Sequence, residues 1–286
     1  MTIAEILARH RAALPGRLKF LFQPAEETVG GAERMIAEGV LEAPHVDAVL
    51  GLHLRNYLPV GHIGVKTGTI FASADELTIT VRGRGGHGAL PHDAVDPIVV
   101  AAHLITALQT LVSRETSPLE PAVVTIAMIQ GGTAFNIIPE RVEMRGTVRA
   151  FDPALRERLL ARVAEQARAL ANAFGAEAEV ATRLGCPAVV NDARMTDLVR
   201  HAGRAELGAD AVEETPGTTW GDDMADFLAL RPGCYFFVGS GNPARGLDRA
   251  HHNPHFDFDE AALSVGARVL ARAALDALAD GARHAD

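Results

Sequence analysis

The sequence predicts an α/β fold, in which a doubly wound, mostly parallel sheet carries an inserted domain of the ferredoxin-like α+β type. Near both ends of the chain, short apolar runs alternate with helical segments, as in parallel βαβ units. Between them, over roughly 72–184, the expected order of elements is β-α-β-β-α-β. We therefore expect one domain from 1–71 and 185–286, incomplete at its amino-terminal end, and a second domain from 72–184.

The elements of the outer domain are predicted from apolar patterning. Residues 2–14 suit an amphipathic helix. The apolar runs 18–22 and 46–54 are typical of buried strands, and a helix is expected between them over 31–39. This strand-helix-strand order favours a right-handed unit in a parallel sheet. Further along the chain we expect a helix over 197–206, a buried strand over 234–238 and a helix from about 259 onward.

The inserted domain is predicted from alternating residues and from helix caps. Leu77, Ile79 and Val81 alternate with polar residues, which indicates a strand with one solvated face. Asp96-Pro97 and Asp152-Pro153 each place a capping residue before a proline in the first turn of a helix. These helices should end near 112 and 175, and the remaining strands are expected over 122–129, 142–149 and 176–182.

Composition and charge exclude several function classes. Hydrophobic residues make up 48% of the 286 residues and charged residues 22%, which is typical of a soluble globular protein. The net charge of -9 disfavours nucleic acid and anionic membranes as partners. No apolar stretch is long enough to span a bilayer, and the first residues lack the pattern of a signal peptide. The only cysteines, Cys186 and Cys234, form no disulfide framework, so a cytoplasmic location is expected.

Three predicted strands of the outer domain run into residues that could bind a metal. These residues are Glu26 and Glu27 after the first strand, His53 at the second, and His251, His252 and His255 after the third. Carboxylates and imidazoles at one edge of a parallel sheet suit a zinc, manganese or nickel site. Of two adjacent acids, one can ligate the metal while the other acts as general base on water. Viewed singly, the acidic pair also suits a helix start, and each histidine suits an ordinary core or surface position.

Two loops of the inserted domain carry further candidates. Gly83–Gly88 has the G-x-G-x-x-G spacing of a dinucleotide-binding loop, but no helix opens directly after it, so nicotinamide binding is disfavoured. We interpret it instead as a loop that presents His87. Asn136 and Arg149 could both bind a carboxylate, but the residues alone favour an asparagine that stabilises its own turn and an arginine at a solvated strand end. The pair Asp222-Asp223, in the outer part of the chain, could cap a helix or support a metal site, and capping is favoured.

Five segments, taken together and in this order, resemble one enzyme family. They are Gln23-Pro24-Ala25-Glu26-Glu27, Gly51-Leu52-His53, Gly85-Gly86-His87 with Pro91-His92, Gly131-Gly132-Thr133 with Phe135-Asn136-Ile137-Ile138-Pro139, and Gly146-Thr147-Val148-Arg149. The sequence is similar to the dinuclear metallo-amidohydrolases related to aminoacylase, hippurate hydrolase and the auxin-amino-acid conjugate hydrolases. The similarity extends over nearly the whole chain.

The resemblance implies hydrolysis of N-acyl amino acids at a site for two divalent metal ions, such as Zn, Mn, Ni or Co. It also implies that the inserted domain is a lid through which the protein forms a homodimer. His252 is preferred to His251 because His252-Asn253-Pro254 fits the His-x-Pro pattern of the family. By resemblance, Glu26 would be the general base, and the metal ligands would be Glu27, His53 and His252. His87 would reach the active site of the partner subunit and stabilise the oxyanion there. The substrate carboxylate would be held by Asn136 and Arg149.

One departure from the family pattern gives a second hypothesis. Family members carry a motif of the type Cys-Gly-His-Asp-Gly-His before the first helix, which supplies two metal ligands, and this sequence lacks it. We therefore expect an incomplete metal site, with three candidate ligands for two metal ions. The alternative function is a non-catalytic, dimerising remnant of such an enzyme, which metal analysis and an amidohydrolase assay would distinguish.

Overall fold

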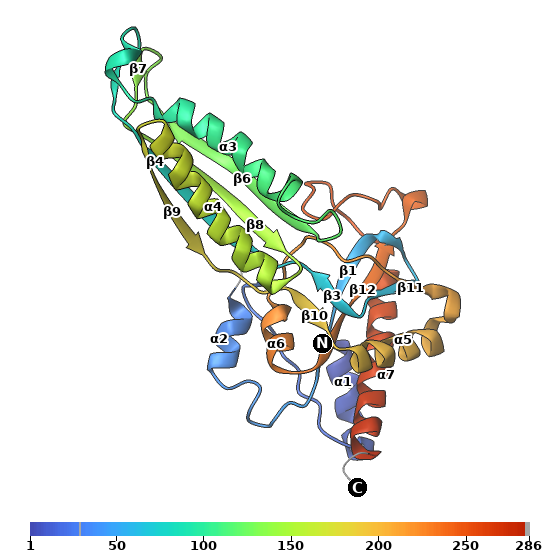
Figure 1. Ribbon diagram of the computed structural model, residues 1–286. Coiled ribbons are helices and arrows are strands. Elements are labelled where there is room, and N and C mark those ends of the chain that lie inside the picture. The colour runs from blue at the N-terminus through green and yellow to red at the C-terminus, as the bar shows by residue number, and fades with distance from the viewer. Residues whose placement is uncertain (29, 284–286) are drawn as a thin grey trace. The chain divides into compact units, whose positions relative to one another are not determined.

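The computed structural model describes residues 1–28 and 30–283, and the chain divides into two compact units (Figure 1). The first unit comprises Met1–Ile70, Val189–Gly217 and the chain from Asp223 onward. The second comprises Phe71–Ala188 and Thr218–Asp222. Over the described residues, no helix is both long enough and apolar enough to cross a membrane.

The first unit is built on a mixed, mostly parallel sheet with the strand order β1-β12-β2-β11. Strand β1 (Val49–Pro59) is parallel to β12 (Gly233–Gly241), and β2 (Ile63–Val65) is parallel to β11 (Val212–Glu214). Only the central pair, β12 with β2, is antiparallel. The mostly parallel sheet of the predicted α/β fold is thus present. Two further short strands, β3 (Gly68–Phe71) and β10 (Val189–Asn191), pair with each other, and β5 (Gly86–His87) pairs with β7 (Ile137–Ile138) in the second unit.

Alternation along β12 decides which side chains enter the core of this unit. Cys234, Phe236 and Val238 are buried among residues of helices α5 (Ala193–Leu207) and α7 (Ala261–Arg283). Burial raises the pKa of the Cys234 thiol to about 12. Because successive side chains of a strand point to opposite faces, Tyr235 and Phe237 lie on the other face of the sheet.

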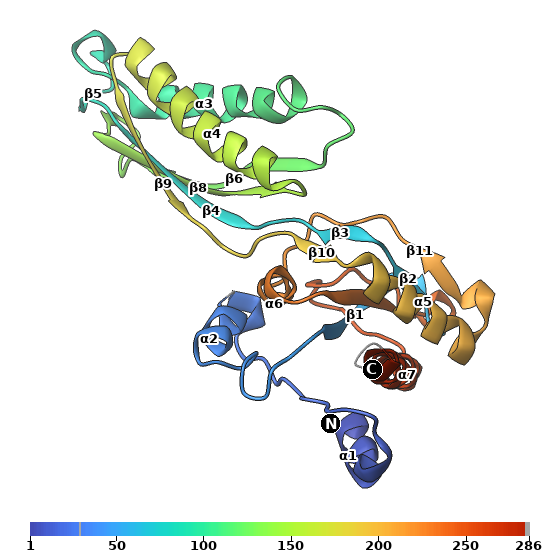
Figure 2. The same cartoon turned by 60° about the horizontal axis from the view of Figure 1, so that its bottom comes forward.

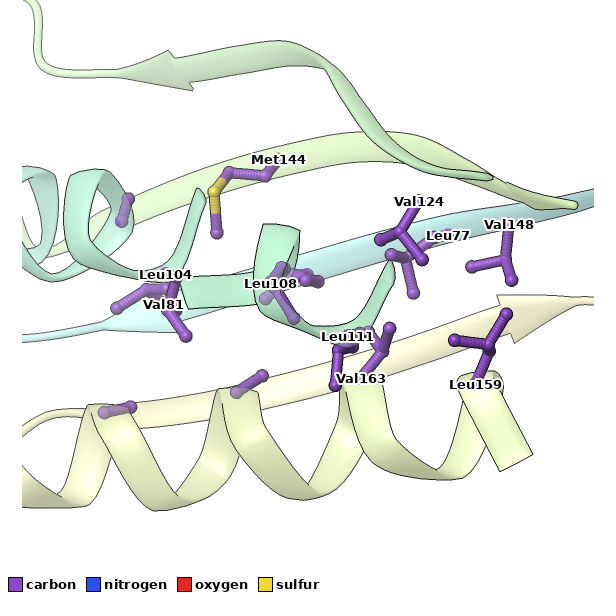
Figure 3. Close-up of a cluster of buried hydrophobic side chains, with 14 of the residues drawn as sticks. Leu77, Val81, Leu104, Leu108, Leu111, Val124, Met144, Val148, Leu159 and Val163 are labelled. Carbon is purple, nitrogen blue, oxygen red and sulfur yellow. The ribbon is translucent and has the colours of Figure 1, made fainter. Parts of the chain in front are cut away.

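The second unit has the element order β-α-β-β-α-β and an antiparallel sheet, β6-β8-β4-β9. Its strands are β4 (Asp75–Arg82), β6 (Ala122–Gly131), β8 (Arg141–Ala150) and β9 (Glu177–Arg183), and its helices are α3 (Pro97–Ser113) and α4 (Pro153–Ala173). Both helices cover the same face of the sheet (Figure 2). Leucine and valine side chains from the helices and strands fill the space between them (Figure 3).

Both helices of the second unit begin where their capping residues predict. The side chain of Asp96 accepts a hydrogen bond from the amide of Ile98 at 2.9 Å. The side chain of Asp152 accepts one from the amide of Leu155 at 2.8 Å. Each carboxylate thus satisfies one of the amides that lack a partner within the first turn.

The amino-terminal part of the first unit differs from the prediction. Residues 18–22 form no strand, and the prediction there was wrong. Instead, Lys19 Nζ donates to the carbonyl oxygens of Val40, Ala43 and Pro44, at 2.5, 3.1 and 3.4 Å. The segment is therefore fixed to the loop after helix α2 (Gly31–Ala37) rather than to a neighbouring strand. The first helix is also shorter than the predicted range 2–14. Helix α1 spans Thr2–Arg9, and a 3₁₀ turn follows over Arg11–Ala13.

Candidate functional site

Two histidines, His53 and His251, meet on the face of β1 that points away from α5 and α7. Leu52 and Leu54 pack against the core with those helices, so His53 between them points to the opposite face. Its ring lies 5.4 Å from the ring of His251 and 6.4 Å from that of Tyr235, centroid to centroid. His53 Nδ1 lies 2.6 Å from the carbonyl oxygen of Leu54. That oxygen can only accept, so the proton sits on Nδ1 and Nε2 is the nitrogen that can bind a cation.

The environment of His251 keeps its ring neutral. Burial lowers the pKa of His251 to about 4, and electrostatic interaction with His53, His252 and Arg55 acts in the same direction. The neutral form of imidazole is the one that ligates metals. His252 lies in the left-handed region of backbone conformation, with φ 63°. Such a φ is uncommon for a residue other than glycine and is concentrated at functional sites.

A buried asparagine fixes the loop that carries these histidines. Asn56 Nδ2 donates to the carbonyl oxygens of Arg249 and Asp257, at 3.0 and 2.8 Å. Its Oδ1 accepts from Ser240 Oγ at 2.5 Å, so the whole amide group is hydrogen-bonded. Because Asn56 follows His53 by three residues in β1, the loop from 249 to 257 is held next to His53. His255, which the sequence also offered as a ligand, is exposed on this loop.

A group of carboxylates lies at the turn that carries the predicted base. Glu26 and Glu27 are in a 3₁₀ turn, Glu26–Thr28, with Glu26 half-buried and Glu27 exposed. Oxygen atoms of Glu26 and Asp223 lie within 4.8 Å of each other. Asp223 precedes helix α6 (Met224–Leu230) but makes no side-chain capping bond to it. The sequence-based preference for a capping role was therefore wrong for Asp223.

Helix α6 places this acidic group beside β1. A Cβ atom on Gly51 would lie 2.9 Å from the ring of Tyr235 and 3.1 Å from the methyl group of Met224, the residue after Asp223. The start of α6 thus packs against β1 two residues before His53. In the part of the chain that the structure describes, Glu27, His53 and His252 do not form a set whose ligand atoms all lie within 4.8 Å. Their assignment as metal ligands stays a prediction.

The candidates of the second unit fall into two places. His87 and Asn136 lie together, because β5 pairs with β7 and the amide of Gly88 donates to the carbonyl oxygen of Asn136 at 2.8 Å. Both side chains are exposed. Arg149 lies at the opposite end of β8, roughly 25 Å away along the strand, and its Nη1 donates to the carbonyl oxygen of Thr219 at 3.1 Å. The structure therefore does not bring Asn136 and Arg149 of one chain to a common carboxylate.

Comparison with known proteins decides the family. The sequence matches the profile of Peptidase family M20/M25/M40 over residues 1–276. The chain belongs to this family. It is 39% identical over 272–274 residues to two bacterial relatives, among them an N-acetylcysteine deacetylase of Bacillus subtilis, of which it covers 69%. It is 35% identical to IAA-amino acid hydrolase ILR1-like 4 of Arabidopsis thaliana, and this match covers 94% of this chain and 61% of that protein.

The solved structures agree with this assignment. The YXEP protein of Bacillus subtilis, described as a dinuclear metal binding peptidase from the M20 family, superposes with a TM-score of 0.79 at 33% sequence identity. The match covers 96% of this chain and 69% of that one. Membership of this family identifies the protein as a hydrolase that acts on amides.

Several residues of the site were not found from the sequence. Asn56 gave no signal, because it lies beyond the predicted strand 46–54 and a single asparagine after a strand is ordinary. His251 was set aside in favour of His252, yet its ring is the one that faces His53. Asp223 was noticed only as half of an acidic pair, and its contacts lie 191 to 200 residues away in the chain. The burial of Asn56, which reveals its role, is known only from the structure.

Proposed function

We propose that the protein hydrolyses the amide bond of N-acyl amino acids at a site on the first unit that depends on divalent metal. The observation that carries this proposal is the approach of the His53 and His251 rings, whose centroids lie 5.4 Å apart, with His252 next to His251 in the chain. The acidic turn with Glu26 and Glu27 is held beside the same strand through α6. The family relatives named for N-acetylcysteine and for amino acid conjugates support this class of substrate.

The donor set fits a borderline-soft divalent cation. Neutral imidazoles together with carboxylates suit Zn, Mn, Ni or Co, and the tautomer of His53 leaves its Nε2 as the acceptor nitrogen. We assign Glu27, His53 and His252 to hold the cation, with His251 directly beside them. When bound, a divalent cation supplies Lewis acidity that polarises the amide carbonyl and makes water more acidic.

The side chains then divide the proton transfers and the binding of substrate. Glu26 takes the proton from the attacking water as the new C–O bond forms, and it gives the proton to the amine as the C–N bond breaks. Arg149 binds the substrate carboxylate with its guanidinium group. Because His87 and Asn136 lie far from Arg149 within one chain, we assign them to the active site of the second copy, where His87 stabilises the oxyanion.

This assignment requires a homodimer, and the second unit offers a surface for one. Strand β6 is an edge of its sheet, and Met128 and Ile129 on it are 47% and 49% exposed. Ile98 and Val99 of α3 are exposed as well. An edge strand with exposed apolar side chains is a template for pairing with another chain. We propose that two copies pair through β6 and α3.

The dimer is tested by placing a charge on this edge. Ile129→Glu should convert a dimer to a monomer, because a buried, unpaired carboxylate strongly opposes association. The molar mass from light scattering during size-exclusion chromatography measures the outcome. Leu230→Glu is the matched control, since Leu230 is 51% exposed in the first unit and should leave the mass unchanged. A dimeric Ile129→Glu protein would contradict the proposed interface.

The activity is tested by metal removal and return. Purified protein should contain a divalent metal by elemental analysis and should release the amino acid from N-acetylcysteine or from hippurate. Treatment with a chelator should remove both metal and turnover, and Zn, Mn, Ni or Co should restore them. Protein that takes up none of these metals and hydrolyses no N-acyl amino acid would contradict the proposal and support the non-catalytic, dimerising alternative.

A further inference from the structure

A carboxylate outside the proposed catalytic set closes the loop that carries Glu26 and Glu27. Asp223 is fully buried. Its Oδ1 accepts a hydrogen bond from Gln23 Nε2, on the entry side of the loop. Its Oδ2 accepts from the amides of Gly30 and Ala32, at 3.3 and 3.0 Å, on the exit side. One side chain thus joins the two ends of the segment from 23 to 32.

The backbone of this segment is folded back tightly at the same place. A Cβ atom on Gly31 would lie 1.7 Å from the carbonyl oxygen of Pro24, so the two ends are in direct contact. Ala25 has φ 54°, in the left-handed region that residues other than glycine seldom adopt. Such a conformation persists only where surrounding contacts fix it. The bonds to Asp223 are contacts of this kind, immediately beside Glu26.

We propose that Asp223 is a positioning residue, which fixes the loop from 23 to 32 and thereby the carboxylates of Glu26 and Glu27. A capping role for α6 does not explain its burial, because its carboxylate makes no capping bond to that helix. Its two oxygens accept three hydrogen bonds, all from residues at the two ends of the loop, so the carboxylate is oriented to hold those ends together. The consequence for catalysis rests on the proposed function, whereas the consequence for the conformation of the loop does not.

Two substitutions of Asp223 separate its geometry from its charge. Asp223→Ala removes all three hydrogen bonds. Asp223→Asn can keep them, because its Oδ1 can accept from Gly30 and Ala32 while its Nδ2 donates to Gln23 after that amide turns over. Asp192→Ala is the matched control. Asp192 accepts from the amide of Met195 at 2.9 Å and caps α5 of the same unit, away from the loop.

Hydrogen exchange by mass spectrometry and steady-state kinetics give the readouts. In Asp223→Ala, exchange in the peptide from 23 to 32 should rise about tenfold, whereas Asp192→Ala should leave that peptide unchanged. In Asp223→Ala, kcat should fall about 10²-fold with little change in KM, since a small displacement of a catalytic group costs about that much. Asp223→Asn should restore most of kcat. A milder variant, Gln23→Ala, should raise exchange in the same peptide without unfolding the unit.

The outcomes decide between the two proposals. If neither Asp223→Ala nor Gln23→Ala changes exchange over 23–32, Asp223 does not fix the loop and this inference is overturned. If exchange rises but kcat of Asp223→Ala stays at the wild-type value, the loop is fixed without serving catalysis, and the positioning role is overturned. If the wild-type protein shows no turnover, the proposed function fails, and the exchange results still decide whether Asp223 holds the loop.

Discussion

Replacing Glu26 by glutamine should lower kcat by about 10³-fold and leave the metal content unchanged, because glutamine has the same shape but cannot accept a proton from water. Glu26 is the half-buried member of the acidic pair, and Asp223 fixes the loop around it. The variant should therefore fold normally and keep a KM close to that of the wild type. Release of the amino acid from an N-acyl substrate, together with elemental analysis, measures both expectations.

Two neighbouring substitutions make the test specific. Glu27→Gln should lose metal and activity together, since Glu27 is the proposed ligand. Glu33→Gln changes an exposed residue in the first turn of α2 and should behave like the wild type. A Glu26→Gln protein with a rate within about fivefold of the wild type would assign the base to another residue. Loss of metal from this variant would instead identify Glu26 as a ligand.

Replacing Asp75 by alanine should destabilise the second unit by about 3–5 kcal/mol, the usual cost of leaving one partner of a buried ion pair uncompensated. Asp75 is buried in β4 and accepts from Arg156 Nε at 2.8 Å and from Arg156 Nη2 at 2.5 Å. It also accepts from the amide of Gly185 at 3.1 Å. The alanine variant removes all three bonds and leaves the mostly buried guanidinium of Arg156 without this counter-charge.

Urea unfolding followed by circular dichroism measures this loss. Because the chain has two units, the transition of the second unit should move to lower urea while that of the first stays in place. Glu179→Ala provides the control, since the Arg82–Glu179 pair is 3.7 Å apart and well exposed, and such pairs contribute about 1 kcal/mol or less. Equal unfolding midpoints for Asp75→Ala and Glu179→Ala would show that burial adds nothing to the Asp75–Arg156 pair.

Local signals made much of the second unit predictable from the sequence. The helices after Asp96 and Asp152 start at their prolines, because the cap and the proline act within one turn. The strands of this unit bury one face against two helices, so their side chains alternate with period two along the sequence. Caps and alternation are local patterns, so they can be recognised without knowing which distant residues pack against them.

The parts that were not predicted depend on distant partners. The apolar run 18–22 has the pattern of a buried strand. A strand also needs a neighbouring strand to pair with, and the local sequence does not show whether such a neighbour is present. The sequence predicted that the ends of the strands that lead to His53 and His251 lie close together. It did not predict that the His251 ring is the one that faces His53. The role of Asp223 follows from Gln23, 200 residues away, which no local pattern records.

Asn56 ties the imidazole-bearing loop to β1 by contacts that involve no residue of the acidic loop. The two halves of the site therefore have separate tethers and can drift apart over evolution. A variant in which the acidic loop is altered should therefore lose turnover but keep His53 on β1 and His251 on the loop that Asn56 holds.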